Sequence, residues 1–165
     1  MGEKPIIDKR FNENIDIDKR VKEGSILARI YIEVQGNDKE AAKKALESTI
    51  FGNLLEERYI DLLSVRFFDI RKDKTGDFFS GVAEIKLLSR DFRWFVSIVM
   101  RYGPSAIEII KPHNVNLSLD EMHSILADVS EISQSYASQI MALLKDDERR
   151  MLYQRIIGKA NKNLI

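Results

Sequence analysis

The order of strand-like and helix-like patterns between residues 25 and 111 most strongly constrains the fold of this chain. The patterns run strand, helix, strand, strand, helix, strand, at about 25–34, 38–56, 59–71, 78–88, 92–102 and 105–111. In the first strand, apolar side chains such as Ile30 and Ile32 alternate with Arg29 and Tyr31. This alternation is typical of a strand with one face on the core and the other on solvent.

Breaks between these patterns lie where turn and capping residues occur. Asn37 or Asp38 can cap the first helix, and Ser89 can cap the second. Gly103 and Pro104 follow the second helix, where a left-handed glycine and a proline end helical structure. These turn and capping residues therefore lie at the ends of the segments that the apolar periodicity predicts.

A β-α-β-β-α-β order predicts an α+β, ferredoxin-like fold with both helices on one face of an antiparallel sheet. The other sheet face would then be open to solvent, to another part of the chain or to a partner. The sequence predicts a charged, loosely packed N-terminal arm over 1–24, the ferredoxin-like domain over 25–115 and a C-terminal helical extension over 116–165.

Composition excludes several classes of function. The chain has 165 residues, 26 basic and 26 acidic side chains and no cysteine. It therefore has no disulfide, thiolate zinc site or cysteine nucleophile, and no overall charge that would attract nucleic acid. No 18-residue apolar run or signal-like start is present, so we expect a cytoplasmic protein with no membrane span. High balanced charge without cysteine is also typical of thermophile proteins.

The C-terminal extension carries an apolar stripe at near-heptad spacing. Ser118 and Glu121 form a capping-box start, and a further helix is expected from Asp146 to Ile157. The stripe consists of Met122, Ile125, Val129, Ile132, Tyr136 and Leu143. Such a stripe must pack against something, either the open sheet face of the same chain or a second copy in a homodimer. Both arrangements agree with the sequence.

The open sheet face is the expected location of any ligand site. Alternation places Arg29 and Tyr31 on this face, and Glu108 on the last strand points the same way. RNA-recognition modules share this topology, but residues 78–85 lack their aromatic spacing. A small molecule therefore fits this face at least as well as RNA, and the balanced charge argues against nucleic acid.

Catalytic and metal-binding patterns are sparse. A polar cleft near Tyr102 and His113 would be the place for an enzyme site that has no recognised motif. Asp120 and His123 share one helix face, but two ligands are too few for a metal site. The sequence also lacks phosphate-binding and nucleophile-elbow motifs, so we predict neither a metal nor a cofactor.

One stretch resembles a known domain type. It runs from Gly81 to Lys86, through Phe92-Arg93-Trp94-Phe95-Val96, and then from Tyr102-Gly103-Pro104 to Pro112. This order of strand, apolar helix, glycine turn and proline-ended strand resembles the ferredoxin-like C-terminal extension of WYL-domain transcription regulators. The resemblance implies the same fold and a tendency to oligomerise. The chain differs from those regulators in lacking an N-terminal helix-turn-helix and the ligand-sensing Trp-Tyr-Leu stretch.

From these observations we expect a non-enzymatic interaction or regulatory module that forms a homodimer. A small-molecule or RNA-binding protein that uses the open sheet face is the first alternative. An enzyme with an unrecognised site is the second.

Overall fold

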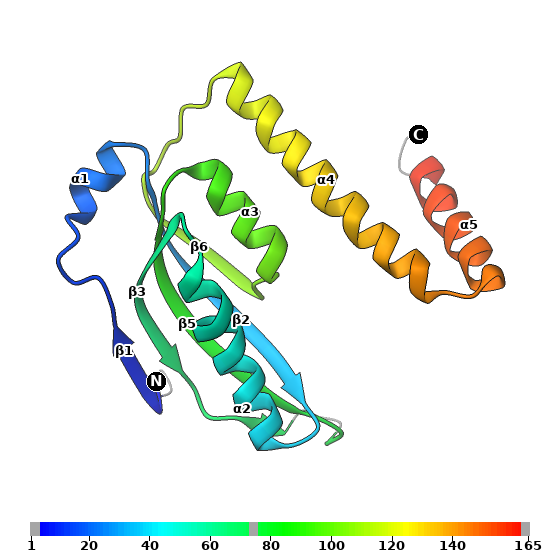
Figure 1. The fold of residues 1–165 in the computed structure, drawn as a ribbon, viewed down its shortest axis with the longest axis horizontal. Helices are drawn as coiled ribbons and strands as arrows, with labels where there is room; N and C mark the ends of the chain where they lie inside the picture. The colour runs from blue at the N-terminus through cyan, green and yellow to red at the C-terminus, as the bar shows by residue number, and fades with distance from the viewer. Residues whose placement is uncertain (1–3, 73–75, 163–165) are drawn as a thin grey trace. The chain divides into compact units, whose positions relative to one another are not determined.

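The computed structural model describes residues 4–72 and 76–162 and confirms the α+β, ferredoxin-like fold (Figure 1). Within this part, the strands are β1 (Ile7–Arg10), β2 (Ile26–Gly36), β3 (Ile60–Phe67), β4 (Arg71–Lys72), β5 (Phe79–Ser89) and β6 (Ala106–Lys111). The helices are α1 (Ile17–Lys22), α2 (Lys39–Glu47), α3 (Phe92–Tyr102), α4 (Leu119–Leu143) and α5 (Asp146–Lys162). The chain divides into two compact units, one up to Ile125 and one from Leu126, and each is described by itself.

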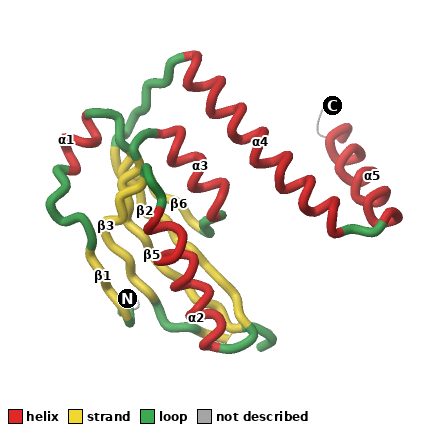
Figure 2. Tube along the Cα trace, viewed as in Figure 1, coloured by secondary structure: helices red, strands yellow, loops and turns green. Residues whose placement is uncertain are grey.

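The sheet of the first unit is antiparallel, with strand order β1-β3-β5-β2-β6 and with β4 paired to β5. The predicted strands are β2, β3, β5 and β6, and the first and third of these lie in the middle of the sheet, as a ferredoxin-like fold requires. Helices α2 and α3 cover one face (Figures 1 and 2). Their side chains Leu46 and Ile98 share one buried core with Ile30, Ile85 and Val65 of the sheet.

The N-terminal segment differs from the loosely packed arm that the sequence predicts. Strand β1 pairs with β3 and adds an edge strand to the sheet. On the sheet face opposite α2 and α3, Ile17 and Val21 of α1 pack against Leu27, Leu63 and Leu88. Elements of four and six residues contain too few apolar positions to display a period, so the sequence pattern does not reveal them.

The helix ends follow the local chemistry, with one correction. Asp38 caps α2 by accepting a hydrogen bond from the Ala41 amide. The cap of α3 is Asp91 and not Ser89, because the Ser89 side chain is buried and its hydroxyl donates to the Asp91 carbonyl oxygen. Gly103 ends α3 with a φ of 52°, in the left-handed region that glycine favours. The predicted helix over 38–56 changes after α2 into a π-helix (Ser48–Asn53) and a 3-10 turn (Leu54–Glu56).

Helix α4 begins at the predicted capping box. The Ser118 amide donates to the Glu121 carboxylate over 2.7 Å, and the Glu121 amide donates to the Ser118 hydroxyl oxygen over 3.2 Å. The Ser118 amide and hydroxyl lower the pKa of Glu121 by hydrogen bonding to its charged form. In the second unit, the Arg149 side chain of α5 donates to the Met141 carbonyl oxygen at the end of α4.

We expect the substitution Gly36→Ala to destabilise the first unit. A Cβ at residue 36 would lie 2.5 Å from the Ala42 amide nitrogen, and therefore the start of α2 would have to move away from β2. The expected loss is about 1–3 kcal/mol of unfolding free energy, measured by urea denaturation. Gly52→Ala is the control, because its Cβ would meet nothing closer than 3.6 Å. Equal stability of the two variants would contradict the proposed close approach of α2 to β2.

Candidate functional site

The open sheet face, opposite α2 and α3, brings together three of the residues predicted to bind a ligand. Arg29 and Tyr31 come from β2, and Glu108 comes from β6, where it lies directly opposite Arg29. Alternation in β2 places Arg29 and Tyr31 on this face, since their neighbours Ala28, Ile30 and Ile32 point into the core. The pairing of Glu108 with Arg29 places Glu108 on the same face.

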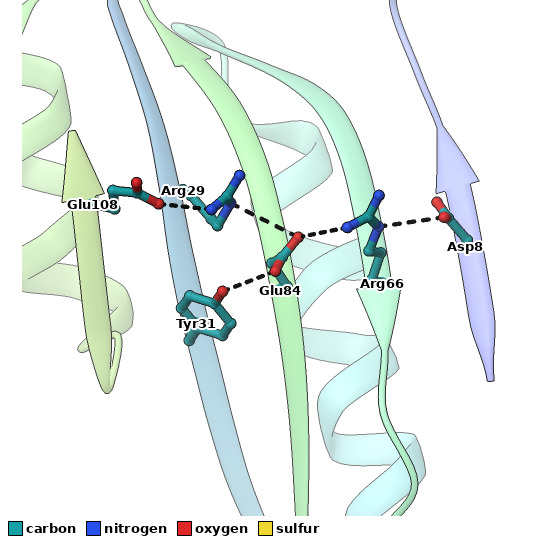
Figure 3. Close-up of polar contacts among 6 residues, drawn as sticks. All are labelled: Asp8, Arg29, Tyr31, Arg66, Glu84 and Glu108. Carbon is teal, nitrogen blue, oxygen red and sulfur yellow. Dashed lines mark hydrogen bonds and ion pairs between the residues drawn. The ribbon is translucent and has the colours of Figure 1, made fainter. Parts of the chain in front are cut away.

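These side chains belong to an ion-pair ladder that crosses the sheet (Figure 3). We define the ladder as Asp8, Arg66, Glu84, Arg29 and Glu108, one residue from each strand in the order β1-β3-β5-β2-β6. Its charges alternate in sign. The successive nitrogen–oxygen distances are 3.3 Å, 3.3 Å, 3.8 Å and 2.8 Å. Each arginine therefore lies between two carboxylates, and the ladder joins both edges of the sheet.

Glu84 is the centre of the ladder and its least exposed member, with 13% of its side chain accessible. Its carboxylate contacts Arg66 and Arg29, and it accepts a 2.8 Å hydrogen bond from the Tyr31 hydroxyl. This hydrogen bond, burial and the negative charge of Glu84 raise the pKa of Tyr31. The tyrosine therefore stays a protonated donor at neutral pH.

A pocket of about 490 Å³ lies on the same face. Its floor is formed by strand residues of β2, β3 and β5, and its wall by the segment between β1 and α1 and by the start of α1. The lining residues are Arg10, Phe11, Asn12, Glu13, Ile15, Ile17, Arg29, Leu63, Ser64, Arg66, Glu84 and Lys86. The ladder residues Arg66, Glu84 and Arg29 thus form part of a concave surface.

Neither Tyr102 nor His113 belongs to the ladder or to the residues that line this pocket. Tyr102, the last residue of α3, packs against the core between the helices and the sheet, and its hydroxyl donates to Glu57 over 2.7 Å. Burial, followed by the contact with Glu57, raises the pKa of Tyr102. The same carboxylate accepts two hydrogen bonds from Arg101. His113 is exposed in the loop after β6, and no contact joins it to Tyr102 among the interactions of the described residues.

Three of the five ladder residues were not predicted from the sequence. Asp8, Arg66 and Glu84 are ordinary charged residues within three different strands, and only the pairing of those strands brings them together. The one usable signal is a charged residue among alternating apolar ones, as at Arg66 between Val65 and Phe67. Over the described residues, no group of three or more potential metal ligands occurs, and no helix is long and apolar enough to cross a membrane.

Helix α4 presents a second candidate surface, and no residue of α4 is buried in the described chain. Of the predicted stripe, Met122, Tyr136 and Leu143 are exposed, whereas Ile125, Val129 and Ile132 are half-buried. Three further large apolar side chains are exposed and were not in the prediction: Leu119, Leu126 and Ile140. We define the α4 seam as Leu119, Met122, Leu126, Val129, Ser133, Tyr136, Ile140 and Leu143.

We expect Glu84→Gln to destabilise the fold by about 1–2 kcal/mol, because two arginines lose the carboxylate between them. Both arginines are more than a third exposed, and solvent screening keeps the loss below that of a fully buried pair. Asp69→Asn is the matched control. It removes a carboxylate from an exposed ion pair with Lys39 at 3.8 Å, with an expected change below about 0.5 kcal/mol. Urea denaturation at low salt measures both, and equal effects would show that the ladder adds nothing.

Comparison with known proteins identifies the family. The model of the MJ0538 family matches residues 27–153. The uncharacterized protein MJ0538 of Methanocaldococcus jannaschii is 31% identical over 104 residues, which are 63% of this chain and 39% of that protein. This chain thus spans about two-fifths of the length of that relative. No solved structure matches the chain, so no structural comparison supports the resemblance to WYL-domain regulators. Because the family match covers most of the chain, the protein belongs to the MJ0538 family.

Proposed function

We propose that this chain is a non-enzymatic interaction module that self-associates by pairing α4 of one copy with α4 of a second copy. The observation that carries the proposal is the α4 seam. Its six exposed large apolar side chains are 41% to 86% accessible. Apolar groups repeated along one side of a helix are stabilised when they are removed from water, and a second copy offers an identical surface.

The spacing of the seam favours a helix–helix contact. From Leu119 to Leu143 its members follow one another at intervals of three, four, three, four, three, four and three residues. This is the a/d pattern of a coiled coil, in which each side chain fits between four of the facing helix. Ser133 is the polar member, and a single polar residue at such a position favours one register over others.

The distribution of charge on α4 favours an antiparallel pair. Its acidic residues, Asp120, Glu121, Asp128 and Glu131, all lie in the N-terminal half, and residues 132–144 carry no charge. Parallel pairing would bring two acidic halves together, whereas antiparallel pairing places each beside an uncharged half. An uncharged surface of this length also suits an interface in a chain that is 32% charged.

In an antiparallel arrangement, the seam side chains of the two copies would also face each other in pairs, and each such pair forms one layer of the interface. With the two-fold axis near residue 131, Leu119 would face Leu143 of the second copy, and Met122 would face Ile140. Leu126 would face Tyr136, and Val129 would face the smaller Ser133 at the centre. Every layer would then contain at least one large apolar side chain, and the seam would be complementary to itself.

The open sheet face supports the non-enzymatic part of the proposal. Its central carboxylate, Glu84, already contacts two arginines and a tyrosine. General acid–base catalysis needs a side chain that can reach a substrate, whereas the carboxylate oxygens of Glu84 are occupied by these three partners.

We expect the chain to be dimeric, and Leu126→Lys to make it monomeric. Leu126 is 66% exposed, so a lysine there should leave the fold intact while placing a charge in the seam. Ser138→Lys is the control, because it adds the same charge on the opposite side of α4. Light scattering over a range of concentrations measures the mass, and circular dichroism verifies the helix content. A monomer at every concentration of the unsubstituted chain would refute self-association.

Cross-linking distinguishes the two orientations, because the natural sequence contains no cysteine. In an antiparallel pair, a mixture of the single variants Met122→Cys and Ile140→Cys should form a disulfide between the two different chains. Met122→Cys alone should remain uncross-linked under the same mild oxidation. The reverse result, a covalent dimer of Met122→Cys alone, would establish a parallel pair and contradict the layers described above.

A further inference from the structure

Basic side chains outnumber acidic ones among the residues that line the pocket on the open sheet face. Four lining residues are cationic, Arg10, Arg29, Arg66 and Lys86, whereas two are acidic, Glu13 and Glu84. We propose that this pocket binds a small organic molecule with a doubly negative group, either a phosphate monoester or a dicarboxylate. Strand register, ion-pair geometry and the size of the pocket support this assignment.

The strand register places positive charges next to one another beside the ion-pair ladder. Lys86 of β5 lies directly opposite Arg29 of β2 on one side and Ser64 of β3 on the other. Arg10 of β1 lies opposite Ser64. Like charges directly opposite each other on neighbouring strands destabilise a sheet. An anion bound over Lys86 and Arg29 would turn this repulsion into attraction.

The carboxylates of the ladder contact Arg29 and Arg66 of the pocket, and do not contact Lys86 or Arg10. Glu108 and Glu84 contact Arg29, and Asp8 contacts Arg66 together with Glu84. No acidic group of the described residues forms an ion pair with Lys86 or with Arg10. These two side chains are therefore available to a ligand, and Ser64 between them adds a hydroxyl donor.

The size and lining of the pocket fit a small molecule with a carbon body. Its volume of about 490 Å³ lies in the usual range for ligand pockets, about 300–1,000 Å³. The wall contributes apolar side chains from Phe11, Ile15 and Ile17, and Leu63 adds to the floor. Glu13 in the wall and Glu84 in the floor would repel a continuous phosphate backbone, which favours a compact anion over a nucleic acid strand.

The test titrates the full chain with inorganic phosphate and, separately, with succinate at constant ionic strength. Calorimetry and thermal denaturation should show saturable binding and a rise in melting temperature with at least one probe. Lys86→Gln should weaken that binding roughly ten-fold or more, since it removes a charge-assisted hydrogen bond. In the absence of anion, the same variant should melt at a higher temperature than the natural chain, because the repulsion from Arg29 is gone.

Two further variants keep the result interpretable. Arg10→Gln removes an exposed cation of the pocket wall and should also weaken binding. Lys43→Gln removes an exposed cation from α2, on the other side of the sheet, and should leave binding unchanged. The proposal is overturned if neither probe binds saturably, if Lys43→Gln weakens binding as much as Lys86→Gln, or if the pocket binds short RNA but neither small anion. A response to phosphate alone or to succinate alone identifies which dianion the pocket prefers.

Discussion

The antiparallel pairing of β2 with β5 determines the chemistry of both sheet faces. Each strand is eleven residues long, and the register runs from Ile26 opposite Ser89 to Gly36 opposite Phe79. In this register Ile30 and Ile85 point together into the core, while Tyr31 and Glu84 meet on the other face. A shift of one residue would bury charges under the helices and expose the core. The apolar core and the ion-pair ladder therefore depend on the same set of hydrogen bonds.

The sequence predicted the elements that have a long and regular period. Strands β2, β3, β5 and β6 and helices α2, α3 and α4 each repeat their pattern often enough to be recognised, and their order allows few topologies. The short elements β1 and α1 could not be recognised in this way, because their stability comes from contacts with β3 and with Leu27, Leu63 and Leu88 rather than from local propensity. The cap at Asp91 was missed for a similar reason, since burial of Ser89 is a property of the assembled fold.

Residues of the candidate sites were likewise predictable where the signal lies within single elements, and not where it depends on how the elements pair. Alternation within β2 and within β6 was enough to place Arg29, Tyr31 and Glu108 on a common face. Their partners Glu84 and Arg66 come from β5 and β3, and the register that aligns these strands is set by packing and by the bulge between Leu62 and Ser64. On α4, the helical period was correct but its phase was not fixed. A stripe through Ile125 and Ile132 and one through Leu126 and Ile140 agree equally well with the sequence. Leu126 and Ile140 are the more exposed pair, and the face of α4 that meets a partner stays a prediction.

The ladder is least exposed at its centre, and this difference in exposure affects how the sheet responds to its medium. Glu84 on the central strand is 13% accessible, whereas Asp8 on β1 and Glu108 on β6 are 40% and 55% accessible. Dissolved salt screens exposed charges far more than enclosed ones. Concentrated electrolyte should therefore loosen the two outer strands while the middle of the sheet keeps its cross-links. In such a medium the sheet would lose its outer strands first, while its central strands stay paired.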